Sequence, residues 1–277
     1  MNIIFRFIKR INFLPIFDTS ILPNRELISR ICAIILFSVF LLLKIRKFSL
    51  FPGSFSVLKD FFNSVNNNYG YEIYQSYEIL LIWIVKLATW LIEIFILGGY
   101  IYVYIRRKKA VGSAVGFMQT IFPFFVAVIP FLITLTPYNF AKNIPVETTN
   151  HLYFYTGIML LIILGVMIKI IALITLQKAF SIMAEARLLI MTGIFKYIRH
   201  PLYTGGFIAF LGSLILRLHF YTVIMFLFFL IGKLIMAVIE EKKLIDFFPD
   251  YKQYKNNTGM FLPKIKSIIK RDWHNGG

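Results

Sequence analysis

Cysteine and acidic residues are scarce in this chain. Its 277 residues include one cysteine, Cys32, and 13 Asp and Glu residues against 30 Lys and Arg residues. A single thiol excludes a disulfide-stapled secreted domain and a zinc module built from cysteines. A hydrophobic content of 58% excludes a disordered chain. Because the mean hydropathy is +0.75 and the apolar runs reach about 20 residues, we expect an integral membrane protein.

The formal charge of +17 does not by itself indicate nucleic-acid binding. Most Lys and Arg residues stand just outside apolar runs, as in the cluster at 106–109. Such clusters contact anionic head groups and set the orientation of membrane helices. We therefore expect the bilayer, and no nucleic acid, as the partner of these charges.

Six apolar runs predict an all-α fold, a polytopic membrane bundle of five to six spanning helices. The fifth run is short and is expected to form a tight helical hairpin with the sixth, turning near 217–219; it is either spanning or partly re-entrant. Residues 1–20 read as an amphipathic interfacial segment, and 48–77 and 136–150 as outer loops. The six runs lie at 27–45, 78–104, 114–135, 152–176, 202–216 and 219–239.

The distribution of basic residues predicts the orientation. An N-terminus on the inside places most of the 30 Lys and Arg residues on the cytoplasmic side, and both termini are then cytoplasmic. Richness in Phe, Ile, Asn and Lys suggests an AT-rich genome and hence a bacterial inner membrane.

Among the charged residues inside apolar runs, we single out four. Lys86 and Glu93 are seven residues apart and share one helix face, either as a functional pair or, as we favour, on a packed helix seam. Lys169 is expected to extend its ammonium group to the membrane boundary, and Lys233 to counter the acidic residues that follow it.

The polar chemistry concentrates after residue 185. A segment containing Arg199, His200 and Tyr203 precedes the hairpin, and Glu240 and Glu241 follow it. Because a hairpin brings its two ends together, we expect one cytoplasmic pocket with a cation and an imidazole facing two carboxylates. Pro201 is expected to begin a helix and to hold the preceding residue out of helical geometry.

Taken together, this pattern resembles the membrane-embedded methyltransferase superfamily that contains isoprenylcysteine carboxyl methyltransferases and phospholipid N-methyltransferases. The resemblance covers about the last 90 residues. The matching positions are Gly193, Tyr197, Arg199, His200, Pro201, Tyr203, Gly205, Glu240, Glu241, Leu244, Phe247, Phe248, Tyr251, Tyr254 and Pro263.

The resemblance implies an enzyme that binds S-adenosylmethionine from the cytosol and takes a lipophilic acceptor from the bilayer. Arg199 and Glu241 are then the catalytic candidates, with Arg199 either pairing with the cofactor carboxylate or positioning the loop; the division of roles between Glu240 and Glu241 stays open. No metal is implied. The implied cofactor-binding residues are Leu189, Gly193, Tyr197, His200, Pro201, Tyr203, Gly205, Glu240, Tyr251 and Tyr254.

Departures from the family pattern bear on the acceptor. Met236 stands where prenylcysteine methyltransferases commonly have an arginine suited to a substrate carboxylate, which argues against carboxylate methylation. O-, N- and S-methylation therefore stay open. We assign residues 151–277 to the methyltransferase core. Residues 1–150, an interfacial segment and three membrane helices, either build a lipid-facing cavity or stabilise the bundle.

Two other functions compete with methyl transfer. Sterol-reductase-like membrane enzymes carry a similar Arg-His-Pro-x-Tyr run but bind NADPH, whose pyrophosphate would be repelled by Glu240 and Glu241. A transporter or scaffold without catalysis is the third possibility, based on Lys86 and Glu93.

Overall fold

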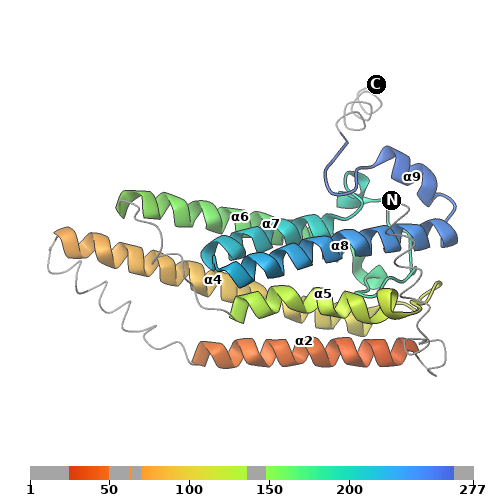
Figure 1. Cartoon of the computed structure of the whole chain (residues 1–277), viewed down its shortest axis with the longest axis horizontal. Coiled ribbons are helices and arrows are strands. Elements are labelled where there is room, and N and C mark those ends of the chain that lie inside the picture. Colours follow the sequence, from red (N-terminus) through yellow and green to blue (C-terminus); the bar gives the residue numbers. More distant parts are fainter. Residues whose placement is uncertain (1–24, 50–62, 64–69, 136–147, 265–277) are drawn as a thin grey trace.

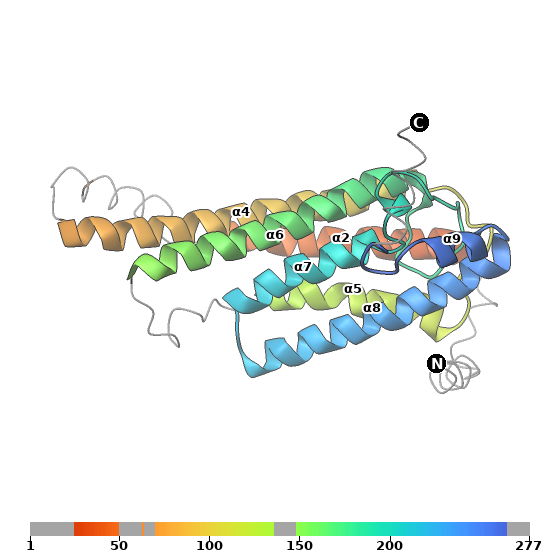
Figure 2. The same ribbon diagram turned by 90° about the horizontal axis from the view of Figure 1, so that it is seen from above.

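The computed structural model describes residues 25–49, 63, 70–135 and 148–264, and its six long helices run side by side in alternating directions (Figures 1 and 2). The predicted all-α class is confirmed: within those ranges there are helices and isolated β-bridges but no strands. The long helices are α2 (Arg25–Ser49), α4 (Gly70–Arg106), α5 (Phe117–Leu135), α6 (Thr148–Leu176), α7 (Pro201–Leu216) and α8 (Phe220–Phe247).

Three segments in the described ranges are long and apolar enough to cross a membrane: Leu27–Arg46, Tyr153–Leu176 and Phe220–Phe247. Two shorter apolar helices, Phe117–Ile133 and Pro201–Leu216, lie beside them. A helical membrane bundle is therefore supported, whereas the number of spans stays a prediction.

The predicted outer loops were too long at both places. Helix α4 begins at Gly70 and α6 at Thr148, so residues 70–77 and 148–150 are helical. With 37 residues, α4 extends to roughly 55 Å and exceeds an apolar layer of about 30 Å. Hydropathy marks where a helix leaves the apolar layer, but backbone hydrogen bonding continues beyond it. Residues 48 and 49 belong to α2 and residue 63 is helical too; the other loop residues and the expected interfacial segment lie outside the described residues.

The hairpin is confirmed. Helix α7 ends at Leu216 and α8 begins at Phe220, so the turn falls on Arg217–His219 as expected. Thr222 closes the start of α8, because its hydroxyl accepts a hydrogen bond from the His219 amide at 3.0 Å and donates to the Arg217 carbonyl at 2.7 Å. Helix α7 begins, and α8 ends, at the end of the bundle that carries α9 (Tyr251–Asn257) (Figure 2).

Helices α6 and α7 approach closely through small residues. A Cβ on Gly205 would lie 2.5 Å from the Gly165 carbonyl oxygen, and one on Gly165 would lie 2.3 Å from the Ala209 amide nitrogen. Such contacts let membrane helices pack at short distance. This packing fixes the hairpin against α6.

Two polar links hold the amino-terminal helices together. Lys44 of α2 pairs with Glu93 of α4 inside the bundle, and the Trp90 indole donates to the Lys44 carbonyl at 2.8 Å. At the α9 end, Arg107 donates to Ser29 at 2.6 Å. The partner of Glu93 is thus on another helix; the side chain of Lys86 lies outside the described residues.

Candidate functional site

His200 stands at the start of α7, where the chain changes direction. Its backbone has φ −123° and ψ 57°, and Pro201 occupies the first helical position, so both local expectations are confirmed. The imidazole is buried and stacks on the Tyr203 ring, with centroids 5.4 Å apart. The His200 ring just before α7 and the Tyr203 ring in its first turn thus form one continuous surface.

The two ends of the hairpin meet at this surface, as the sequence predicts. Nε2 of His200 lies 3.3 Å from a Glu241 carboxylate oxygen, and Nδ1 lies 3.7 Å from Glu240. Tyr203 donates a hydrogen bond to Glu240. Residues about 40 positions apart therefore form one polar cluster at the end of the hairpin.

The two adjacent glutamates have different surroundings. Glu241 is almost fully buried and accepts from Arg199 at 2.7 Å and from Lys255 at 2.8 Å, besides its contact with His200. Glu240 meets the Tyr203 hydroxyl and the more distant imidazole, and its side chain keeps 20% of its surface exposed. Glu241 is saturated by the protein's own cations, whereas Glu240 retains acceptor capacity.

Arg199 ties the cluster to the segment that follows α9. Its guanidinium donates to the carbonyls of Lys255, at 2.9 Å, and Thr258. The backbone amides of Arg199 and His200 donate to the carbonyls of Gly259 and Met260 at 2.8 and 3.0 Å. Residues 258–260 therefore lie along the segment that leads into α7.

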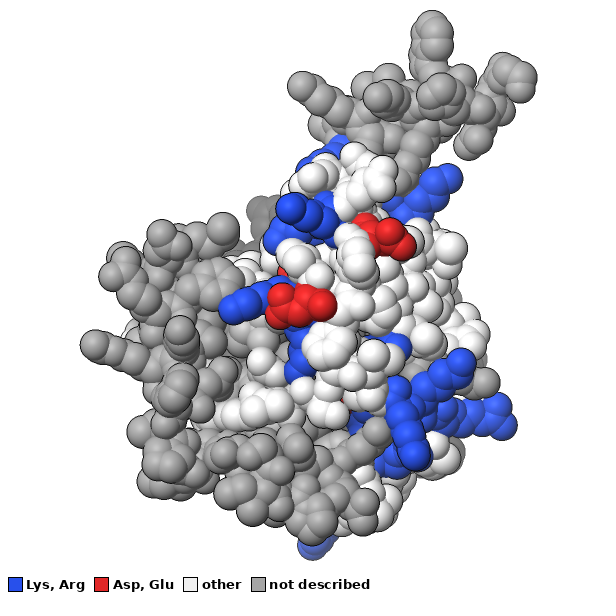
Figure 3. Space-filling view, turned by 90° about the vertical axis from the view of Figure 1, so that its right-hand side faces the viewer, with Lys and Arg blue, Asp and Glu red and all other residues white. Residues whose placement is uncertain are grey.

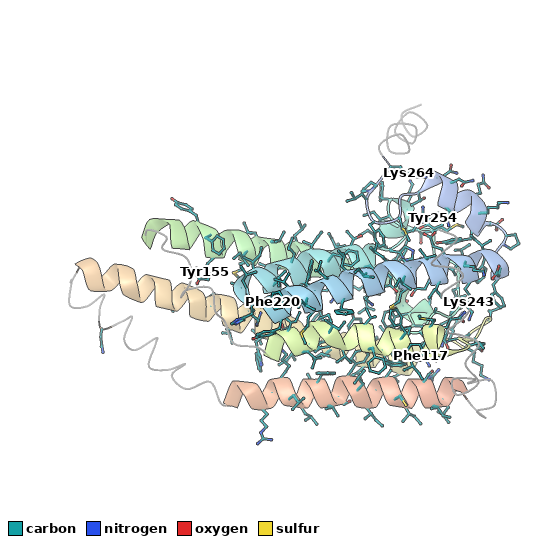
Figure 4. The ribbon with its side chains drawn as sticks, in the orientation of Figure 1. Phe117, Tyr155, Phe220, Lys243, Tyr254 and Lys264 are labelled. Atoms are coloured by element: carbon teal, nitrogen blue, oxygen red, sulfur yellow. The ribbon has the colours of Figure 1, made fainter. Side chains whose placement is uncertain are left out.

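Helix α9 covers the same end of the molecule. Tyr251 and Tyr254 are buried, with rings 5.5 Å apart, and Tyr254 donates to the Phe195 carbonyl at 2.6 Å. Burial raises the pKa of Tyr251 well above its usual range, and the nearby Glu241 charge adds to the rise. Figure 4 shows Tyr254 and Lys243 near this end, and Phe220 at the other end of α8.

In the described part of the chain, four of the sequence-predicted residues make no hydrogen bond, ion pair or ring contact with this cluster. Gly193 has φ +58° and packs on Thr175 of α6; Tyr197 is 45% exposed and Leu189 is partly buried. Gly205 faces α6, so helix packing accounts for it without a ligand. The expectation that this glycine lets backbone approach a ligand is not supported by its surroundings.

An apolar cavity between the helices adjoins the cluster. It has a volume of ≈ 130 Å³, and Tyr203 contributes to both its wall and the cluster. Helices from both halves of the chain line it, through residues such as Phe37, Tyr100, Pro130, Val166, Gly206 and Phe210. An apolar ligand in this cavity would lie beside the polar groups around Glu240.

Sequence reasoning missed several residues of this region. Lys255 and the returning segment around Thr258 and Phe261 contact the cluster, and Phe261 lies against the His200 ring at 5.8 Å. In the sequence of this segment, only Gly259 and Pro263 indicate a turn. Tyr100 lies in the half of the chain that shows no motif.

The outer face at this end of the bundle is rich in Lys and Arg side chains with fewer acidic ones, as Figure 3 shows. In the described residues, no three His, Cys, Asp or Glu side chains gather as they would around a metal ion. The cluster thus offers carboxylate, imidazole, guanidinium and phenol groups. The described helices thus carry these polar groups at the end of a hairpin, directly beside an apolar cavity.

Comparison with known proteins shows which family the carboxy-terminal part of the chain resembles. Residues 158–246, which run from α6 through α8, match the isoprenylcysteine carboxyl methyltransferase (ICMT) family. The chain is also 34% identical over 113 residues to the protein-S-isoprenylcysteine O-methyltransferase of Saccharomyces cerevisiae, covering 38% of this chain and 47% of the relative. The chain therefore spans about half the length of the curated relative that it matches. The predicted resemblance of the carboxy-terminal part to this superfamily is confirmed.

Proposed function

We propose that the chain is an integral membrane methyltransferase that uses S-adenosylmethionine and methylates a lipid or another hydrophobic acceptor. The observation that carries the proposal is the polar cluster of His200, Tyr203 and Glu240 beside the apolar cavity. The family match covers the helices that build this cluster. Residues 151–277 then form the methyltransferase core.

The groups of the cluster fit the cofactor by charge. Glu240 has a carboxylate with acceptor capacity left and 20% side-chain exposure, which suits an ammonium group or ribose hydroxyls. Tyr203 and His200 present stacked ring faces next to it. A bound cofactor would supply a methyl group activated by its sulfonium.

We assign different roles to the adjacent glutamates. Because Glu241 is already neutralised by Arg199 and Lys255, it holds the α9 segment over the cluster and does not bind the cofactor. Arg199 then acts as a positioning residue, one of the two roles that the resemblance left open. Glu240 is the residue that binds the ligand.

The remaining tasks of the protein are alignment and exclusion of water. Buried Tyr251 and Tyr254 close the cluster toward the outside, and Tyr203 separates it from the apolar cavity. Alignment of two reactants and removal of water both lower the barrier to a displacement reaction. An ionised carboxylate acceptor would need no base, whereas an amine must first lose its proton.

The amino-terminal helices complete the acceptor cavity in this proposal. Phe37 of α2, Tyr100 of α4 and Phe131 of α5 all line it. In this proposal the α9 end of the bundle faces the cytoplasm, which the basic cluster around Arg106 and Arg107 at that end favours. The comparisons do not support a bacterial inner membrane, since the relative found is from yeast.

Calorimetric titration of the purified full chain tests the proposal. Saturable binding of S-adenosylmethionine is expected, with no binding of NADPH. Binding of NADPH alone would indicate the reductase-like enzyme, and binding of neither would leave the transporter or scaffold; the family match favours neither alternative. Mass spectrometry of membrane extracts incubated with isotopically labelled methyl donor then identifies the methylated acceptor.

A further inference from the structure

Three lysines of α6 and α8 point into the bundle, and they differ in their partners. The ammonium groups of Lys169 and Lys233 lie over aromatic rings, 5.7 and 4.5 Å from the ring centroids. Lys169 thus does not extend to the membrane boundary as the sequence suggested, whereas Glu240 attracts Lys233 from a distance, in partial agreement with the expected counter-charge. Lys243, in the last turns of α8, instead donates hydrogen bonds to the amino-terminal half of the chain.

The Lys243 side chain is buried where α8 meets the turn between α4 and α5, residues 107–116. Its ammonium group donates to the side-chain oxygen of Gln119 at 2.7 Å and to the carbonyl of Ser113. The same Gln119 oxygen accepts a hydrogen bond from the Val115 amide at 3.1 Å. One lysine of α8 therefore contacts both the turn and the first turn of α5.

The turn that holds Lys243 is itself fixed in place. The amides of Val111 and Gly112 donate to the Ala186 carbonyl at 2.8 and 2.9 Å, and the Ala186 amide donates back to Gly112 at 2.9 Å. A Cβ on Gly112 would lie 2.4 Å from the Phe247 ring, so this ring packs directly on the turn. The acceptors of Lys243 are therefore held against the segment that precedes the site and against the end of α8.

Lys243 and Glu241 are anchors on nearly opposite sides of the same stretch of α8. Successive residues of an α-helix are rotated by about 100°, so these two side chains point roughly 160° apart and Glu240 lies between them. Glu241 is held by two cations of the polar cluster. In Figure 4, Lys243 lies on the side of α8 away from Tyr254. Two anchors on opposite sides oppose rotation of α8 about its axis and so fix the direction of Glu240.

We propose that Lys243 is a positioning residue, which anchors the end of α8 to the turn between α4 and α5 and thereby directs Glu240 toward Tyr203. The inference rests on the proposed function, in which Glu240 binds the ligand. Both acceptors of Lys243 lie outside residues 158–246, which match the family. The amino-terminal part of the chain thus acts on the polar cluster as well as lining the cavity.

Calorimetric titration of the full chain with S-adenosylmethionine tests this role. Lys243→Met removes both hydrogen bonds, and we expect roughly 10-fold weaker affinity, because a binding group that is no longer held in place loses much of its contact. Lys242→Met is the matched control, since it removes the same charge from an exposed position of the same turn, and it should bind like the parent. Parent-like affinity in Lys243→Met would overturn the proposal.

Substitutions of the acceptor keep the test independent of whether Lys243→Met folds. Gln119 is only partly buried. Gln119→Leu removes one of the two acceptors and should weaken affinity roughly threefold, whereas Gln119→Glu keeps an oxygen for Lys243 and should restore the affinity of the parent. Equal affinities of the two Gln119 variants would contradict the role of the lysine.

A double-variant cycle separates positioning from general destabilisation. If Lys243 acts through Glu240, Lys243→Met should lower affinity roughly 10-fold in the parent but hardly at all when added to Glu240→Gln. A general loss of structure would lower the affinity by the same factor in both backgrounds. Equal factors would therefore also overturn the proposal.

A signal that needs no cofactor separates this inference from the proposed function. The His200 ring lies 3.7 Å from Glu240, so its NMR signal in histidine-labelled protein should shift in Lys243→Met, as in Glu240→Gln, and stay unchanged in Lys242→Met. These shifts in a chain that does not bind S-adenosylmethionine would overturn the proposed function and leave the positioning role standing. A chain that binds S-adenosylmethionine, with the same affinity and the same His200 signal after Lys243→Met, would do the reverse.

Discussion

Buried charges are paired differently in two regions, the amino-terminal helices α2 and α4 and the carboxy-terminal hairpin α7–α8. In the former, Lys44 and Glu93 form a one-to-one pair. In the latter, Glu241 meets two cations, Arg199 and Lys255, and the His200 ring. The nearest such neighbour of Glu240 is the imidazole at 3.7 Å, and Lys233 forms no ion pair with another described residue. Full pairing within the chain indicates a structural role. Charge that the chain itself leaves incompletely paired indicates a site for a ligand, because desolvated charge is costly without a partner.

The largest effect is expected at the one-to-one ion pair between α2 and α4. Lys44→Met leaves Glu93 without its partner, and we expect a loss of about 3–5 kcal/mol in stability. The double variant Lys44→Met with Glu93→Leu should recover most of that loss. Thermal unfolding in detergent measures both, and a double variant no more stable than the single one would show that the pair is not the cause.

A smaller loss is expected at the other saturated carboxylate. Glu241→Gln removes the charge that meets Arg199 and Lys255, and we expect about 2–3 kcal/mol of destabilisation, since the amide keeps some hydrogen bonds. Limited proteolysis should show earlier cleavage near α9. If this variant is as stable as the parent but fails to bind S-adenosylmethionine, the roles of the two glutamates are reversed.

The neighbouring carboxylate should respond in binding and not in stability. Glu240→Gln keeps an acceptor for the Tyr203 hydroxyl but loses the charge, which predicts a 10- to 100-fold loss of S-adenosylmethionine affinity, or about 1.5–3 kcal/mol. His200→Ala should lower the affinity similarly, since its ring stacks on Tyr203. Calorimetry measures the affinity, and a melting temperature close to the parent's is the control. Parent-like affinity in both variants would refute the cofactor assignment.

The smallest effect is expected in the amino-terminal half, away from the cluster. Lys86→Met should leave S-adenosylmethionine affinity within about twofold of the parent, because the residue belongs to α4 and sites without shared partners act nearly independently. The same calorimetric titration measures it. A loss as severe as that of Glu240→Gln would bring this lysine into the site and remove the contrast between the two halves.

Much of the site follows from the order of residues along the chain. Because a hairpin brings the end of its second helix back to the start of its first, the sequence predicts that His200 and Glu240 lie close together, and they do. Pro201 likewise begins α7 as its fixed φ requires. The predicted ranges of the loops, 48–77 and 136–150, are too long, because a polar stretch can still be helical. The sequence suggests that Gly205 lies against a ligand, whereas in the structure it packs on α6; the sequence does not show which neighbour a glycine approaches.

The sequence by itself determined an all-helical membrane bundle, the turn at 217–219 and the polar cluster at the hairpin end, because hydropathy, proline geometry and chain connectivity act locally. Only the tertiary structure decided that Glu93 pairs with Lys44, that Glu241 is saturated while Glu240 is not, and that Lys169 and Lys233 face one cavity. Those outcomes depend on how helices distant in sequence are rotated against one another. No local pattern fixes that rotation.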